Sequence, residues 1–181
     1  MNALQSASFD NTPTFNLQNK IVTAKCLDLY DGDTGTFAIN IHDTIYKFKM
    51  RLSGIDTPEM RPPKSQSDRE IEKKAAKYVR NRLLQLLLQA EEEVDLKKDY
   101  SKNEIRDKLA RNGRMVFLRC GKTGKFGRCL IKIFLREDDL ADKSKSLNKL
   151  LIREHLAYKY HGGTKNNDFK TYFSLESSAY V

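Results

Sequence analysis

Apolar and polar residues alternate along three successive stretches in the first third of the chain. Ile21 to Tyr30 is rich in β-branched and apolar residues, and Thr36 to Ile41 and Tyr46 to Leu52 alternate with a period of two. This period is typical of β-strands with one buried face. The turn signals Asp31-Gly32 and His42-Asp43 separate the stretches. The pattern therefore predicts three consecutive strands joined by tight turns.

The spacing of apolar residues becomes helical after Pro62-Pro63. Between Ala75 and Ala90 apolar residues recur at intervals of three and four, and basic residues occupy the opposite face. Ser67 followed by Glu70 predicts a capping box at the start of this segment. One amphipathic helix is therefore expected after the three strands.

Two more strands and two more helices are predicted in the second half of the chain. Arg114 to Cys120 and Arg128 to Leu135 have strand character, with a glycine-bounded turn between them. Ser146 to Leu156 places leucines on one side of a helix, and Asp168 to Ser178 predicts a last helix capped by its first residue. This order of elements is typical of a small antiparallel sheet or barrel with helices packed on it.

The remaining segments are expected at the surface. Residues 1–19 are rich in Asn, Ser, Thr and Gln and predict a flexible N-terminal tail, which leaves one domain over residues 20–181. Residues 91–112 carry charges of both signs and few apolar anchors. We expect a charged surface insertion there, with a short helix from Ile105 to Ala110.

The balance of charge favours a polyanionic partner. The chain of 181 residues has 33 lysines and arginines against 24 aspartates and glutamates, for a formal net charge of +9. An excess of this kind favours nucleic acid or an anionic surface, although charge that only keeps a protein soluble gives the same count. The apolar fraction of 39% indicates a globular protein.

Cysteine usage and the absence of targeting patterns favour an intracellular protein. The three cysteines, Cys26, Cys120 and Cys129, include no CxxC pair, which favours reduced thiols over a disulfide framework or a zinc site. Cys120 and Cys129 lie near the ends of neighbouring predicted strands and are the pair that an oxidising setting would join. The first residues lack a secretory signal, and the apolar cluster Leu83 to Leu88 is too short to span a bilayer.

Acidic and basic side chains gather at the ends of two predicted strands. Asp31-Gly32-Asp33-Thr34 follows the first strand, and Asp56-Thr57-Pro58-Glu59 follows the third, on which Arg51 lies. Carboxylates grouped against their own repulsion favour a cation, and an arginine at the same place favours an anion. Each segment alone is more typical of an ordinary turn. Together they indicate a site for a hard metal and a phosphate, as phosphodiester cleavage requires.

These segments carry a resemblance to a known family. Arg51 to Glu59, preceded by Asp31 to Thr34 and followed by Lys125 to Arg128, resembles the staphylococcal nuclease (thermonuclease) family. The spacing within the first segment matches that family without a gap, and Leu147 to Ala157 is similar to its second helix. The similarity spans residues 22–160. It implies an α+β fold, a five-stranded Greek-key β-barrel of the OB type with about three packed helices.

The resemblance also implies an activity and a role for each matching residue. The expected protein is a monomeric Ca²⁺-dependent nuclease that cleaves DNA and RNA with little sequence specificity, at the 5′ P–O bond, leaving 3′-phosphates. Asp33 and Asp56 would bind one Ca²⁺ ion through their carboxylates, and Thr57 through its backbone carbonyl. Glu59 would act as the general base, and Arg51 and Arg128 would bind the phosphate and the charge that develops on it.

The chemistry of these residue types agrees with the implied roles. Ca²⁺ takes about six to eight oxygen ligands, so three protein ligands leave room for water and a phosphate oxygen. A planar guanidinium pairs with two phosphate oxygens at once, which a lysine cannot do with the same geometry.

Four further residues are candidate substrate contacts: Lys125, Phe126, Tyr158 and Tyr160. The family often has tyrosine where this chain has Phe126, so one hydroxyl contact to phosphate is missing, while Lys125 keeps the adjacent cation. The family also places a tyrosine after its second helix to support the base, and both Tyr158 and Tyr160 fit that description.

A group of basic residues is equally compatible with a nucleic-acid rim and with an ordinary solvated surface. Two other functions stay open: a nuclease-like module that binds nucleic acid without cleaving it, and a structural barrel that binds none. The presence of all the expected polar site residues favours the enzyme over the module. The candidate rim residues are Lys47, Lys49, Lys64, Arg69, Lys73 and Lys77.

Overall fold

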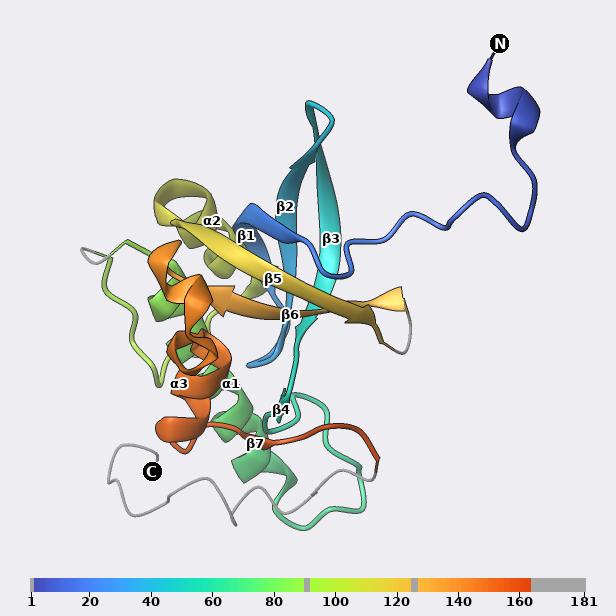
Figure 1. The fold of residues 1–181 in the computed structure, drawn as a ribbon. Helices are drawn as coiled ribbons and strands as arrows, with labels where there is room; N and C mark the ends of the chain where they lie inside the picture. The colour runs from blue at the N-terminus through green and yellow to red at the C-terminus, as the bar shows by residue number, and fades with distance from the viewer. Residues whose placement is uncertain (1, 90–91, 125–126, 164–181) are drawn as a thin grey trace.

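A computed structural model describes residues 2–89, 92–124 and 127–163. Five strands close a barrel in the order β1-β2-β3-β6-β5 (Figure 1). All neighbouring pairs are antiparallel except β3 and β6, which run parallel. The predicted α+β fold with an OB-like five-stranded barrel and three helices is confirmed, but the sheet is mixed rather than antiparallel. The barrel strands are β1 (Ile21–Leu29), β2 (Thr34–Ile41), β3 (Thr44–Leu52), β5 (Met115–Thr123) and β6 (Cys129–Phe134).

The β2–β3 hairpin projects beyond the closed part of the barrel (Figure 1). Its strands pair from Thr34 opposite Arg51 as far as the tip, where His42 and Asp43 both have positive φ, 48° and 63°. Two consecutive positive φ angles are typical of the hairpin turn that matches strand twist. Strand β6 pairs with β3 only at residues 50–52. The outer half of the hairpin is therefore not covered by β6.

The core follows the predicted alternation of each strand. The side chains of Phe37, Ile39, Met50 and Leu52 are fully buried inside the barrel, and burying one such side chain contributes about 1.5–3 kcal/mol. Three α-helices pack on this barrel within the described residues, α2 against β1 and α3 against β6. They are α1 (Arg69–Leu87), α2 (Lys102–Asn112) and α3 (Leu147–Arg153).

The capping box predicted at the start of α1 is absent there, and α2 has one instead. Helix α1 begins after Asp68 without a side-chain cap, and the hydroxyl of Ser67 donates instead to the Asp68 carboxylate at 3.0 Å. The reciprocal bonds of a capping box occur at α2, where Ser101 and Glu104 bond each other's backbone N–H groups. The N-cap of α1 is Asp68, and Ser67 lies one residue before it. Ser67 and Glu70 therefore do not occupy the N-cap and N3 positions that a capping box requires.

The charged segment after α1 is more firmly packed than its sequence predicts. Val94, Tyr100, Ile105 and Leu109 are all buried in the core. Helix α2 is also longer at both ends than the predicted helix, which covered residues 105–110. The charges of this segment lie on its surface, but apolar residues anchor it to the body of the protein.

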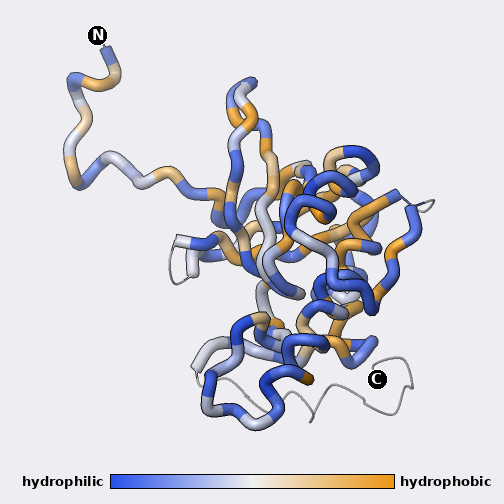
Figure 2. The backbone as a smooth tube through the Cα atoms, turned by 180° about the vertical axis from the view of Figure 1, so that it is seen from behind, coloured by the Kyte–Doolittle hydropathy of each residue, from blue (hydrophilic) through white to orange (hydrophobic). Residues whose placement is uncertain are grey.

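Two short strands that the periodicity did not predict lie below the barrel in the view of Figure 1. Strands β4 (Ile55–Asp56) and β7 (Tyr158–Lys159) pair antiparallel, with Asp56 opposite Tyr158. The loop between β4 and α1 is largely hydrophilic (Figure 2). This small sheet connects the end of β3 with a segment far along the chain.

The first residues of the chain lie away from the barrel core (Figure 1). Residues 2–16 are exposed throughout and extend away from the barrel (Figure 1), with one short 3₁₀ turn at Ala3–Ser6. The helix predicted over residues 168–178 lies outside the described residues. No helix in the part of the chain that the structure describes is long and apolar enough to cross a membrane.

Candidate functional site

Two buried aspartates, one from the loop before β2 and one from β4, share one arginine. Arg51 Nη1 lies 2.7 Å from one carboxylate oxygen of Asp33, and Arg51 Nη2 lies 2.6 Å from the other. The same Nη2 also donates to Oδ1 of Asp56. Both aspartates are only 2% exposed. The structure therefore brings together the three residues that the sequence analysis placed at a common site.

A threonine links this cluster to Arg128. The hydroxyl of Thr34 donates to Asp33 Oδ1 at 2.9 Å, and Arg128 Nη1 donates to the same hydroxyl at 3.4 Å. Thr34 lies opposite Arg51 in the β2–β3 pairing. Arg51 of β3 and Arg128, which directly precedes β6, are thus both next to Thr34.

The loop before β2 is shaped by Asp31 and Gly32. Asp31 Oδ1 accepts hydrogen bonds from the backbone N–H groups of Asp33, at 3.1 Å, and Thr34, at 2.7 Å. A Cβ atom at Gly32 would lie 2.4 Å from a side-chain carbon of Val79 on α1. Only glycine allows the loop to approach the helix this closely, and this approach fixes the position of Asp33.

The site holds more negative charge than its environment stabilises. Burial raises the pKa of Asp33 well above its ordinary value, the charge of Asp31 adds to this, and Arg51 offsets only part of it. Burial also raises the pKa of Asp31. Burial lowers the pKa of Arg51, but Asp33 and Asp56 outweigh this effect, so its pKa is raised overall. The cluster therefore favours additional positive charge.

The hydroxyl groups of the two candidate tyrosines have different partners. Tyr158 lies opposite Asp56, and its hydroxyl donates to Asp56 Oδ2 at 3.0 Å. The hydroxyl of Tyr160 donates to the carbonyl of Gly163 at 2.8 Å, and its ring packs edge-on against that of Tyr158, with centroids 6.2 Å apart. Tyr158 is thus placed at a carboxylate of the cluster, whereas Tyr160 is placed beside the cavity described below.

The turn that carries Thr57 and Glu59 is anchored by a residue that the sequence analysis missed. Glu72 of α1 is 4% exposed, and its Oε1 accepts the backbone N–H of Glu59 at 2.8 Å. Gln66 Nε2 donates to the other oxygen of Glu72 at 2.5 Å. Thr57 is buried and Glu59 is half-buried. Glu72 precedes Ala75 by three residues on the apolar face of α1, and this spacing is the signal that could have found it.

A buried asparagine holds the other side of the site. Asn148 of α3 donates to the carbonyls of Ser53, at 2.9 Å, and Ile131, at 3.0 Å, and accepts the N–H of Ile133 at 3.1 Å. Its amide therefore ties the turn after β3 to strand β6. This turn leads directly into β4, so Asn148 helps to set the position of Asp56.

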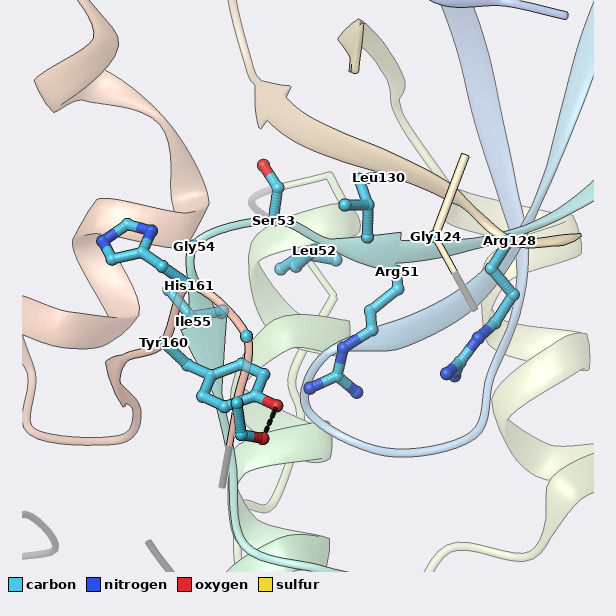
Figure 3. A pocket seen from close by; sticks show the side chains of 12 residues that line it. Arg51, Leu52, Ser53, Gly54, Ile55, Gly124, Arg128, Leu130, Tyr160 and His161 are labelled. Atoms are coloured by element: carbon cyan, nitrogen blue, oxygen red, sulfur yellow. Dashed lines mark hydrogen bonds between the residues drawn. The ribbon is translucent and has the colours of Figure 1, made fainter. Parts of the chain in front are cut away.

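A cavity of about 700 Å³ opens beside the cluster. Figure 3 shows the side chains of Arg51 and Arg128 next to each other at this cavity, with Tyr160 and His161 across from them. Asp33 and Asp56 are not among the residues that line it, so the cavity meets the carboxylates through Arg51. Lys125 and Phe126 lie outside the described residues. The remaining lining residues are Leu52, Ser53, Gly54, Ile55, Gly124, Leu130, Gly162 and Gly163.

The three cysteines carry free thiols. Burial raises the pKa of Cys26 to about 12. A hydrogen bond between the thiols of Cys120 and Cys129 raises the pKa of Cys120 and lowers that of Cys129. Cys129 directly follows Arg128, but none of these thiols lines the cavity within the described residues.

The donor chemistry of the aspartates fits a hard cation. Among the described residues, no three or more His, Cys, Asp or Glu side chains are grouped so that they could hold a metal ion. Asp33 and Asp56 nevertheless direct carboxylate oxygens at one point, now taken by Nη2 of Arg51. Hard anionic oxygens are the ligands that Ca²⁺ prefers, and the remaining ligands would be the Thr57 carbonyl, water and substrate.

No protein-family model matches the chain, and no curated protein matches it significantly. The fold and the geometry together define an OB-like barrel protein with a buried aspartate–arginine cluster at the wall of a cavity.

Proposed function

We propose that this protein is a Ca²⁺-dependent nuclease that hydrolyses phosphodiester bonds of DNA and RNA with little sequence specificity. One observation carries the proposal: Asp33 and Asp56 converge on the Nη2 atom of Arg51, at the wall of a cavity that Arg128 also lines. The carboxylates supply a place for a cation, and the two guanidinium groups supply a place for a phosphate. Phosphodiester hydrolysis uses both together.

The two arginines are placed to bind the scissile phosphate. Each guanidinium is permanently charged and offers parallel N–H groups that pair with two phosphate oxygens. Arg51 contacts both the carboxylates and the cavity, so its guanidinium can exchange a carboxylate partner for a phosphate oxygen. Arg128 directly precedes the neighbouring strand β6 and approaches the phosphate from a second direction. Pre-arranged donors of this kind stabilise the charge that develops on the phosphate oxygens.

The metal and the base have separate positions in the proposed site. When bound, Ca²⁺ neutralises the aspartates and polarises the phosphoryl group. Asp33, Asp56 and the Thr57 carbonyl would hold it. Glu59 takes a proton from the attacking water, whose oxygen forms the new bond to phosphorus as the bond to the 5′ oxygen breaks. The departing 5′ oxygen takes a proton from solvent, so the products are a 3′-phosphate and a free 5′-hydroxyl.

A chelator experiment tests this proposal. Purified protein is incubated with single-stranded DNA and RNA oligonucleotides in EGTA and in excess Ca²⁺, and product ends are identified by mass spectrometry. We expect cleavage to 3′-phosphates in Ca²⁺, none in EGTA, and recovery when Ca²⁺ is restored. Asp33→Asn should abolish that recovery. Equal cleavage in both buffers would contradict the proposal, and binding without cleavage in either would identify a non-catalytic nucleic-acid-binding module.

A further inference from the structure

A line of basic residues on β3 ends at Arg51. Alternate residues of a strand point to the same face, so Lys47, Lys49 and Arg51 share the face opposite to the buried Met50 and Leu52. Successive members are about 6.6 Å apart along the strand, at about 3.3 Å per residue. Both lysines are exposed. We name these three residues the basic row.

Lys47 and Lys49 of the basic row lie on the projecting hairpin, beyond the part of β3 that pairs with β6. Strand β6 covers β3 only from Met50 to Leu52, and the hairpin extends away from there toward His42 and Asp43 (Figure 1). A chain bound at the proposed phosphate position of Arg51 therefore meets Lys49 first and Lys47 next as it continues toward the hairpin tip.

An exposed aromatic ring accompanies the lysines. Tyr30 is 44% exposed, and Lys49 Nζ lies 5.9 Å from the centre of its ring. An aromatic face beside a cation is the combination by which proteins bind single-stranded nucleic acid: the ring stacks on a base and the cation contacts the backbone. Tyr30 directly precedes the loop of Asp31 and Asp33, so this ring is close in sequence to the proposed cation site.

The surface beside the basic row is also basic. Asp28 of β1 lies opposite Thr36, which lies opposite Lys49, so the three residues follow one line across the sheet. The carboxylate of Asp28 is covered by Arg106, at 2.8 Å, and Lys102, at 3.8 Å, both from α2. The one acidic group on this line is therefore already paired, and a polyanion approaching β3 meets net positive charge.

Two of the other candidate rim lysines are already paired with carboxylates. Lys73 pairs with Glu70 at 2.7 Å, and Lys77 pairs with Asp99 at 2.5 Å. Neither Lys47 nor Lys49 forms an ion pair with any residue in the described ranges of the chain. Of the lysines that the sequence analysis considered together, the two in the basic row combine exposure, unneutralised charge and continuity with Arg51.

We propose that the outer face of β3 binds the backbone of a single-stranded nucleic acid, which runs from the phosphate at Arg51 toward the tip of the β2–β3 hairpin. This inference rests on the proposed function and names the form of its substrate. The row is one residue wide, and two residues of β3 match roughly the length of one extended nucleotide. A single strand fits this surface, whereas a duplex presents two backbones and needs a broader one.

Salt-dependent binding in EGTA, where no cleavage occurs, tests the inference. The probe is a fluorescent oligothymidylate of about twelve nucleotides, followed by anisotropy between about 50 and 200 mM salt. Each phosphate contact on a single strand contributes about 0.7 to the slope of log affinity against log salt. Lys47→Gln/Lys49→Gln should lower the slope by about 1.4. The matched control is Lys97→Gln/Lys143→Gln, which removes the same charge at exposed positions and should change the slope far less.

Three additional measurements complete the test. Tyr30→Ala should weaken binding by a similar factor at every salt concentration, because stacking does not depend on counterions. The row variant should lose more affinity for the long probe than for a single nucleotide, which reaches only one member of the row. An unlabelled duplex of the same length should compete less well than the single strand; equal competition would overturn the single-strand assignment.

Failure of this inference can be told apart from failure of the proposed function. Equal slopes for the row and control variants overturn the inference, while cleavage in Ca²⁺ by the wild-type protein leaves the function standing. Binding with the expected slopes, but without cleavage in Ca²⁺, overturns the function and supports the surface. A wild-type protein that does not bind the long probe overturns the inference as well.

Discussion

The carboxylate of Glu72, buried on α1, accepts the backbone N–H of Glu59 at 2.8 Å. The position of Glu59 is therefore set by a helix and not by the turn alone. The second oxygen of Glu72 accepts a hydrogen bond from Gln66, so both of its oxygens have protein partners. A proposed general base is thus held near the aspartates by a side chain that itself stays outside the chemistry.

Replacing Glu59 with glutamine removes the proposed base but keeps its size. We expect kcat on single-stranded DNA to fall by about 10²–10⁴, the typical contribution of general base catalysis. Circular dichroism should show an unchanged fold. Glu93→Gln, at an exposed position, is the control and should keep wild-type turnover. Wild-type kcat in Glu59→Gln would exclude this residue as the base.

Replacing Glu72 with alanine leaves the N–H of Glu59 without its acceptor. The free energy of unfolding should fall by about 1–3 kcal/mol, because a buried donor loses its partner. kcat should fall more than KM changes, since the base is displaced while the arginines stay in place. Glu72→Gln keeps an acceptor oxygen and should recover most of both losses, measured by urea unfolding and steady-state kinetics. If the alanine and glutamine variants behave alike, the bond to Glu59 has no positioning role.

Replacing either arginine with lysine keeps the charge and removes the planar pair of donors. Arg51→Lys and Arg128→Lys should each lower kcat/KM by about 10²–10³, as removal of a transition-state donor does. Lys64→Gln, at an exposed position of the β4–α1 loop, should change kcat/KM by less than about threefold. Similar small losses at all three positions would contradict the assignment of the arginines.

Replacing Tyr158 with phenylalanine removes the hydrogen bond to Asp56. The affinity for Ca²⁺, measured by calorimetry without substrate, should fall by about 10-fold, because groups that orient metal ligands typically contribute that much or more. Tyr160→Phe is a matched control, since its hydroxyl donates to the Gly163 carbonyl and not to the aspartates. A Ca²⁺ affinity that falls equally in both variants would show that the contact to Asp56 is not what matters.

The capping box of α2 predicts how the stability of the protein depends on pH. The ion pair with Lys98 and the N–H of Ser101 lower the pKa of Glu104 from 4.5 to about 2. A lowered native pKa stabilises the folded state above pH 4.5, and this stabilisation is lost as the pH falls from 4.5 toward 2. Glu104→Gln should therefore melt below the wild type at neutral pH, and the difference in Tm should shrink at about pH 3.5. A difference independent of pH would contradict this account.

The strands and α1 could be predicted because their periodicity is local. Residues two apart in a strand, or three and four apart in a helix, carry the pattern themselves. Capping boxes could not be assigned this way, because Ser67 with Glu70 and Ser101 with Glu104 have the same spacing and only the second pair flanks a helix start. The parallel pairing of β3 with β6 depends on how the barrel closes, which no local pattern records.

The residues of the site also differ in whether the local sequence could predict them. Asp33, Arg51 and Asp56 were expected together because they lie at or just after the ends of two predicted strands, which bring the two segments together if they are neighbours. Glu72 and Asn148 act through packing between distant elements, so their hydrogen bonds have no signature in neighbouring residues. The different positions of Tyr158 and Tyr160 follow from a pairing between two-residue strands, which are too short to show alternation.

The pairing of β4 with β7 also sets an order of assembly. The ribosome makes Asp56 early and Tyr158 late, since 102 residues separate them in sequence. During synthesis the aspartates and both arginines emerge before Tyr158. A nascent chain can therefore close its barrel before Tyr158, whose hydroxyl orients Asp56, has been synthesised.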